Sequence, residues 1–232
     1  MNAKPYRSSS AVASVCKTLC AIACAIAATY STVAAQPPTL KANTVSESEK
    51  KTQEMVATLA GGCFWCTEAV FERMEGVNDV VSGYIGGHVV NPTYEQVCGK
   101  KTGHAEAVEV YYDPTKVTYE ELLEVFFKTH DPTTLNRQGA DEGPQYRSSV
   151  FYHNEEQKKA AAKYIEKLNA SGEFGAKVVT LLEEATKFYP AEEYHQDFYR
   201  RNPNQGYCRA VVSAKVRKFD QSFGDKKKKE VK

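Results

Sequence analysis

The pattern of hydrophobic and polar positions predicts alternating strands and helices from residue 55 onward. Strands are expected where apolar residues run together or alternate with polar ones, and helices where they recur at spacings of three and four. The predicted strands cover residues 55–60, 77–85, 105–112, 149–152 and 177–182, and the predicted helices cover 63–74, 118–127, 154–170 and 191–200. This alternation predicts an α/β or α+β fold with one mixed sheet.

Two long segments, residues 86–104 and 130–147, have no hydrophobic period. Irregular loops of this length are uncommon inside a compact domain and are usually functional. We therefore expect the active site to draw on both segments.

The first 35 residues have the layout of a secretory signal peptide. A short basic start precedes an apolar run over 19–28 and the small residues 33–35. The run is about half of the roughly 20 residues that span a bilayer. We therefore expect an exported, periplasmic protein with no transmembrane segment in its mature chain. Cys24 follows three small or apolar residues and is a weaker signal for a lipid anchor.

The polar residues 36–54 are expected to form a flexible leader, followed by a folded domain over 55–218. Thirty basic and 29 acidic residues give a formal charge of +1, which gives no indication of a nucleic-acid partner. The lysine-rich end predicts a basic, disordered tail over 219–232. Of the seven cysteines, those outside the signal peptide are Cys63, Cys66, Cys98 and Cys208.

Cys63 and Cys66 flank Phe64 and Trp65 at the expected start of a helix. The positive end of a helix favours a thiolate, so the pKa of Cys63 is expected to fall toward neutrality. A zinc site would need a second matched pair of ligands, and a structural disulfide across two residues would constrain the unfolded chain little. Redox or nucleophilic chemistry is therefore the favoured interpretation.

Phe64 and Trp65 are either ordinary core residues or the walls of a small apolar pocket beside the sulfur. Glu106 has the same strand parity as Val108 and Val110, so its side chain is expected on the apolar face. Burial there would raise its pKa and make it a proton donor near pH 7. The alternative is that Glu106 faces a basic partner or solvent.

Several ordered motifs over residues 56–217 together resemble peptide methionine sulfoxide reductase A. They are Gly62-Cys63-Phe64-Trp65, Gly83-Tyr84 with Gly86-Gly87, Asn91-Pro92-Thr93-Tyr94, Thr102-Gly103-His104-Ala105-Glu106-Ala107, His130-Asp131-Pro132 and Gln145-Tyr146-Arg147-Ser148. The resemblance implies reduction of the S epimer of methionine sulfoxide, free or in oxidised proteins. It also implies a monomer with a two-layer, ferredoxin-like α/β fold, a mixed sheet and flanking helices.

The resemblance also implies roles for individual residues. Cys63 would attack the sulfoxide sulfur and become a sulfenic acid, and Glu106 would supply the proton. The other implied contacts are the methyl pocket of Phe64 and Trp65, a further substrate contact at Tyr207, hydrogen bonds from Tyr94 and Tyr146, and ordering of the site by Asp141. No metal or prosthetic cofactor is implied, and a thioredoxin-like protein would supply electrons.

This sequence departs from many relatives in having a cysteine at position 66, where they carry glycine. Either Cys66 or Cys208 would attack the sulfenic acid, and Cys208 is favoured because relatives carry a resolving cysteine near the C-terminus. Cys98 is expected to be a packing residue. Two other functions stay open from the residues alone: an exported thiol–disulfide oxidoreductase using Cys63 and Cys66, and a binding module with a structural disulfide.

Overall fold

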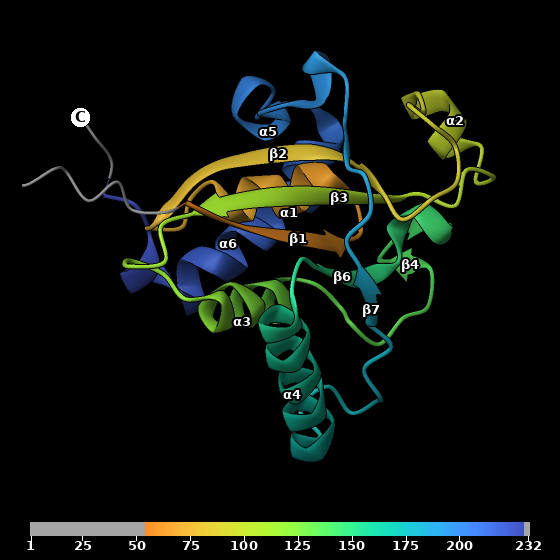
Figure 1. The fold of residues 1–232 in the computed structure, drawn as a ribbon. Coiled ribbons are helices and arrows are strands. Elements are labelled where there is room, and N and C mark those ends of the chain that lie inside the picture. Colours follow the sequence, from red (N-terminus) through yellow and green to blue (C-terminus); the bar gives the residue numbers. More distant parts are fainter. Residues whose placement is uncertain (1–53, 230–232) are drawn as a thin grey trace, which may run out of the picture. The chain divides into compact units, whose positions relative to one another are not determined.

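The computed structural model describes residues 54–229, in which a mixed sheet carries the fold (Figure 1). Its strands lie in the order β7-β6-β1-β3-β2-β8. Only β6 and β7 run parallel, and the other neighbours are antiparallel. The strands are β1 (Met55–Gly61), β2 (Val77–Ile85), β3 (Ala105–Tyr112), β6 (Ser148–Tyr152), β7 (Leu181–Glu184) and β8 (Tyr189–Pro190). The mixed sheet with flanking helices confirms the predicted fold class.

Three of the helices begin where the sequence predicts them, and two others, over Tyr94–Cys98 and Ser213–Ser222, were not predicted. They are α1 (Phe64–Phe71), α2 (Tyr94–Cys98), α3 (Tyr119–Thr129), α4 (Glu155–Ser171), α5 (Phe198–Arg201) and α6 (Ser213–Ser222). Thr118 and Asn154 cap α3 and α4 by accepting hydrogen bonds from backbone amides. Helices α1 and α6 lie behind the sheet in Figure 1 and cover one of its faces.

Strand parity separates the two faces of the sheet. Leu59, Val108 and Val110 belong to the main core together with side chains of α1, α3 and α6. A smaller cluster lies on the opposite parity and contains Ala60, Ile85, Ala105, Ala107 and Phe151. Because Glu106 shares the parity of Val108, its side chain belongs to the helix-covered face.

Two predicted elements differ from those in the structure. Strand β7 starts at Leu181 rather than at residue 177, because the preceding segment binds a loop: the Val179 amide donates to the Pro132 carbonyl over 2.8 Å. The helix predicted over 191–200 is divided into a 3₁₀ turn, Glu193–His195, and the single turn of α5. Asp197 separates them with a φ of +54°, a left-handed conformation that interrupts a helix.

The structure also contradicts the disordered tail expected from residue 219. A π-helix over Cys208–Val212 continues into α6, and the side chains of Phe219 and Phe223 are buried. Farther on, the Lys228 amide donates to the Arg73 carbonyl over 2.8 Å. The expectation considered the lysines and overlooked the two aromatic anchors. The predicted signal peptide, most of the predicted leader and residues 230–232 lie outside the described residues.

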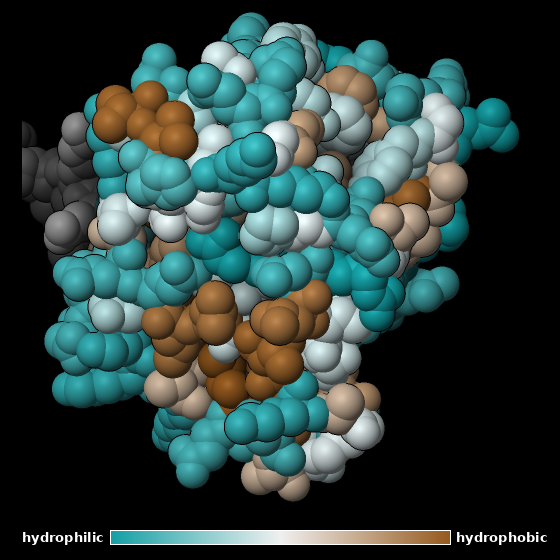
Figure 2. Space-filling view, turned by 90° about the vertical axis from the view of Figure 1, so that its right-hand side faces the viewer, coloured by the Kyte–Doolittle hydropathy of each residue, from teal (hydrophilic) through white to brown (hydrophobic). Residues whose placement is uncertain are grey.

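Figure 2 shows the side of the molecule to which α2, β4 (Arg137–Gln138) and β7 extend in Figure 1. This surface is mostly hydrophilic, with a compact hydrophobic group in its lower half. Among residues 54–229, none of the helices combines the length and the apolar character needed to cross a membrane.

Candidate functional site

Cys63 stands at the point where β1 turns into α1. It is the N-cap residue of the helix, and the preceding Gly62 has a φ of +93°. A Cβ atom on Gly62 would lie 2.5 Å from Cγ of Gln138, far inside van der Waals contact. Position 62, in the turn that presents Cys63, therefore requires glycine for two reasons: its φ is positive, and its backbone lies close to Gln138 of the 130–147 segment.

Glu106 lies beside this turn because of the strand register. Leu59 of β1 pairs with Val108 of β3, which brings Glu106 next to the end of β1. The side chain is 1% exposed, and its Oε2 accepts the Phe64 amide over 3.1 Å. Burial raises the pKa of Glu106 to about 8, so the carboxyl group holds its proton at neutral pH. The predicted burial and the predicted direction of the pKa shift are both confirmed.

The expected low pKa of Cys63 is wrong for the reduced protein. The side chain is 7% exposed, and burial raises its pKa well above that of an ordinary thiol. The hydrogen bond to Cys66 and the nearby Glu106 act in the same direction. The sequence argument considered the helix N-terminus and omitted desolvation, which is the larger effect here.

Cys66 is the thiol whose pKa falls. The hydrogen bond from Cys63 is the largest cause, Lys215 contributes a favourable charge, and the pKa of Cys66 decreases to about 7. The Lys215 ammonium lies 3.5 Å from the Gly61 carbonyl, close to the start of α1. In the reduced site, burial therefore raises the pKa of Cys63, while Cys63 and Lys215 lower that of Cys66.

The two long segments meet at this site, as predicted. Tyr94 comes from the first segment, at the start of α2, and Asp141 and Tyr146 come from the second. Burial raises the pKa values of Tyr94 and Tyr146, and Glu106 is close enough to contribute to both shifts. Both phenols therefore keep their protons and can donate hydrogen bonds to a ligand beside Glu106.

Tyr207 joins the C-terminal segment to the same site. Its hydroxyl donates to Oδ2 of Asp141 over 2.5 Å and lies 4.0 Å from Sγ of Cys66. Asp141 therefore orders Tyr207 directly. Cys208 follows it, is completely buried, and has its pKa raised by burial and by the nearby Cys66. Among the described residues, Cys63, Cys66, Cys98 and Cys208 are all free thiols.

Phe64 and Trp65 belong to an aromatic group with residues that sequence reasoning did not select for the site. The indole of Trp65 stacks on Phe198, with ring centroids 3.7 Å apart, and its Nε1 donates to Nδ1 of His195 over 3.2 Å. His195 is 1% exposed and also contacts the Phe64 ring. The Tyr194-His195-Gln196 sequence was a visible signal for His195, whereas Phe198 had none.

Glu192 is a second residue that the sequence did not reveal. Its two carboxylate oxygens accept the Tyr84 hydroxyl and the Tyr94 amide, each over 2.9 Å. Tyr94 is therefore held at its backbone by a residue almost 100 positions later in the chain. A contact of this range leaves no local pattern in the sequence.

Comparison with known proteins identifies the family. The family model for peptide methionine sulfoxide reductase matches residues 55–228. The chain belongs to this family. Peptide methionine sulfoxide reductase MsrA 1 of Rhodopirellula baltica is 72% identical over 182 residues, which are 78% of this chain and 94% of the relative. The MsrA protein of Deinococcus radiodurans is 57% identical over 170 residues, covering 73% and 82%.

Solved structures agree with this peptide methionine sulfoxide reductase assignment. Reduced Mxr1 from Saccharomyces cerevisiae matches with a TM-score of 0.63 and 38% identity, covering 68% of this chain and 91% of Mxr1. Methionine sulfoxide reductase A of Corynebacterium diphtheriae matches with a TM-score of 0.58 and 36% identity, covering 65% and 76%. Within residues 54–229 of the present reductase, no group of three or more His, Cys, Asp or Glu side chains is arranged to hold a metal ion.

Proposed function

We propose that this protein reduces methionine-S-sulfoxide, free or in oxidised proteins, to methionine. The observation that carries the proposal is a protonated, buried Glu106 beside a cysteine at a helix start, in a chain of the peptide methionine sulfoxide reductase family. A sulfoxide oxygen is a poor leaving group until it is protonated, so an acid with a pKa of about 8 suits this reaction at neutral pH.

The aromatic group orients the substrate. Phe64 and Trp65 bind the methyl group, while Glu106, Tyr94 and Tyr146 face the sulfoxide oxygen. Glu106 donates a proton to this oxygen, and the two phenols stabilise the developing charge through hydrogen bonds. The Cys63 sulfur attacks the substrate sulfur. In the net step the oxygen is transferred to Cys63, which is oxidised by two electrons to a sulfenic acid, while the substrate is reduced to methionine.

Cys66 has a role in the attack of Cys63 before it has one in resolving the sulfenic acid. A thiol must lose its proton to become a strong nucleophile, and the Cys63 thiol already donates to Cys66. Cys66 therefore accepts the Cys63 proton as the attack begins. The two cysteines belong to the same helical turn, in which the Cys66 amide donates to the Cys63 carbonyl over 3.1 Å.

A second cysteine then resolves the sulfenic acid. The position of Cys66 in the same helical turn as Cys63 favours it as the first resolving residue, in place of Cys208, which the resemblance favoured. Attack by Cys66 forms a Cys63–Cys66 disulfide and releases water. Burial and the nearby Cys66 raise the pKa of Cys208, and this proximity lets Cys208 take over the disulfide by exchange. A thioredoxin-like protein then supplies two electrons and restores the thiols.

The decisive assay measures turnover of the two methionine sulfoxide epimers with a dithiol as reductant. We expect the S epimer to be consumed and the R epimer to remain. Disulfides formed without reductant are then mapped by mass spectrometry in Cys66→Ser and Cys208→Ser variants, with Cys98→Ser as the control. A Cys63–Cys66 bond in the Cys208→Ser variant supports the proposed order, and consumption of both epimers at equal rates contradicts the proposed function.

We also propose export to the periplasm, supported by the sequence of residues 1–35 alone. The N-terminal sequence of the mature protein, recovered from a periplasmic fraction, tests this. A start near residue 36 supports export, an intact Met1 contradicts it, and a lipid-modified Cys24 indicates anchoring instead.

A further inference from the structure

Helix α1 carries a second buried acid, Glu68, which the proposed reaction does not use. Its side chain is 1% exposed. Oε1 accepts the Ser82 hydroxyl over 3.0 Å and the Asp197 amide over 3.1 Å, and Oε2 accepts the Phe198 amide over 3.2 Å. Two consecutive backbone amides thus bind the two oxygens of one buried carboxyl group.

The backbone of Asp197 creates this arrangement. Its φ of +54° is a left-handed conformation, which is strained for a non-glycine residue and persists only where the surroundings maintain it. A left-handed residue followed by a helical turn points successive N–H groups toward one concave site that suits an anion. Glu68 occupies that site, so the strained turn and the buried carboxyl group stabilise each other.

The side chain that follows this turn covers Trp65. The Phe198 ring lies parallel to the indole, with an interplanar angle of 6° and ring centroids 3.7 Å apart. His195, at the other end of the same short segment, accepts the indole N–H. Residues 195–198 therefore hold Trp65 both by stacking and by a hydrogen bond, and Glu68 holds the backbone of that segment against α1.

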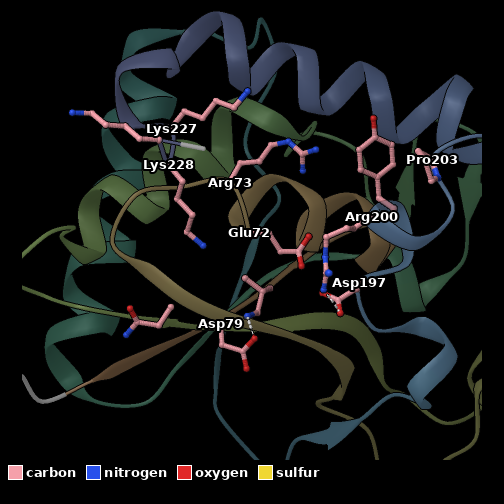
Figure 3. Close-up of a pocket in the computed structure, with 12 residues that line it drawn as sticks. Glu72, Arg73, Asp79, Asp197, Arg200, Pro203, Lys227 and Lys228 are labelled. Carbon is pink, nitrogen blue, oxygen red and sulfur yellow. Dashed lines mark hydrogen bonds and ion pairs between the residues drawn. The ribbon is translucent and has the colours of Figure 1, made fainter. Parts of the chain in front are cut away.

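A second contact supports the same turn from the far end of α1. Figure 3 shows Glu72, one helical turn beyond Glu68, and Arg200 of α5 both directed at the Asp197 carboxyl group. Arg200 lies 2.5 Å from Oδ2 of Asp197, and burial together with the nearby Asp197 carboxyl group raises the pKa of Glu72 to about 8. These side chains form part of the wall of a cavity of about 790 Å³. Glu68, by contrast, binds the backbone amide of Asp197.

We infer that Glu68 is a positioning residue for the substrate pocket: by binding the Asp197 and Phe198 amides, it fixes Phe198 on Trp65 and so fixes the methyl-binding wall. The identity of the bound methyl group rests on the proposed function, whereas the positioning of Trp65 does not. Loss of Glu68 therefore weakens substrate binding more than it slows the attack of Cys63.

The variant Glu68→Gln tests this with almost no change in volume. The amide nitrogen of glutamine cannot accept a hydrogen bond, so at least one of the two backbone amides loses its partner. We expect KM for methionine-S-sulfoxide to rise about tenfold, while kcat changes by less than about threefold, because the unpaired amide loosens the segment that holds Trp65 and leaves Cys63 and Glu106 in place.

Fluorescence provides a readout that is independent of activity. Trp65 is the single tryptophan of the chain, so tryptophan emission reports on its environment alone. We expect emission of Glu68→Gln at longer wavelength than in the unmodified protein, because water reaches an indole that has lost its stacked ring. Phe198→Leu, which keeps Glu68, is expected to give the same shift and the same rise in KM.

Ser82→Ala is the matched control. It removes the Ser82 hydroxyl as a donor to Glu68 and leaves the Asp197 and Phe198 amides bound. We therefore expect the emission wavelength to be unchanged and KM to stay within about twofold of the value of the unmodified protein. Native emission and native KM in folded Glu68→Gln overturn the inference. If that variant does not fold, an unchanged KM in Phe198→Leu overturns it. If the unmodified protein reduces no sulfoxide, the proposed function fails. The Trp65 emission of Glu68→Gln then still decides whether Glu68 positions Trp65.

Discussion

Glu106 and Cys63 show how far single residues are predictable from their neighbours in sequence. The parity of Glu106 with Val108 and Val110 favoured the buried face and left a basic partner or solvent as the alternative. The structure buries the side chain, and burial gives the direction of its pKa shift. The same reasoning failed for Cys63, because a helix N-terminus is visible in sequence whereas the burial of the thiol depends on distant segments. Burial that follows from strand parity was predictable, whereas burial by distant segments was not.

The pH dependence of turnover tests the role of Glu106. A carboxyl group with a pKa of about 8 donates a proton below that pH and cannot donate one above it. Activity is therefore expected to fall as the pH rises through about 8. Glu106→Gln is expected to lose about 10²- to 10⁴-fold in kcat, the usual contribution of a general acid, and its residual activity should lack this fall. If Glu106→Gln shows the same fall in activity as the pH rises through about 8, the group that ionises there is not Glu106.

At the scale of elements, the hydrophobic period predicted β2, β3, α3 and α4, and its absence marked the two segments that supply Tyr94 and Tyr146. It missed α6 and several short elements, among them α2, the 3₁₀ turn, α5 and the π-helix. These short elements exist because of tertiary contacts, such as the amides of Asp197 and Phe198 that bind Glu68. A single turn of helix has no period long enough to detect.

The turn from β1 into α1 is the element on which the site depends most, and Gly62→Ala tests it. A Cβ atom would strain the positive φ and collide with Cβ and Cγ of Gln138. We expect the free energy of unfolding to fall by about 1–3 kcal/mol, and kcat/KM to fall at least about tenfold as Cys63 moves relative to Glu106. Urea unfolding and steady-state assays measure the two effects.

Gly224→Ala is the control for that substitution, because a Cβ atom there meets nothing within 4 Å. It is expected to leave both quantities within experimental error. If Gly62→Ala behaves like this control, the close approach to Gln138 does not matter for the site.

At the scale of the whole molecule, the site exists only after distant parts of the chain come together. Cys63 and Glu106 meet through the register of β1 and β3, while Asp141 and Tyr207 meet through a hydrogen bond between residues 66 positions apart. Sequence motifs indicated which residues belong together, and the resemblance to the family supplied their roles. Neither gave the strand order β7-β6-β1-β3-β2-β8, which places these residues at one end of the sheet.

A single-turnover experiment tests the central claim most directly, which is that Cys63 removes the sulfoxide oxygen. The reduced protein is mixed with methionine-S-sulfoxide without any reductant, and free methionine and the cysteine oxidation state are quantified by mass spectrometry. The account predicts that the unmodified protein forms methionine in step with oxidation of Cys63, and that Cys63→Ser forms none. Methionine produced by Cys63→Ser at the rate of the unmodified protein would contradict it.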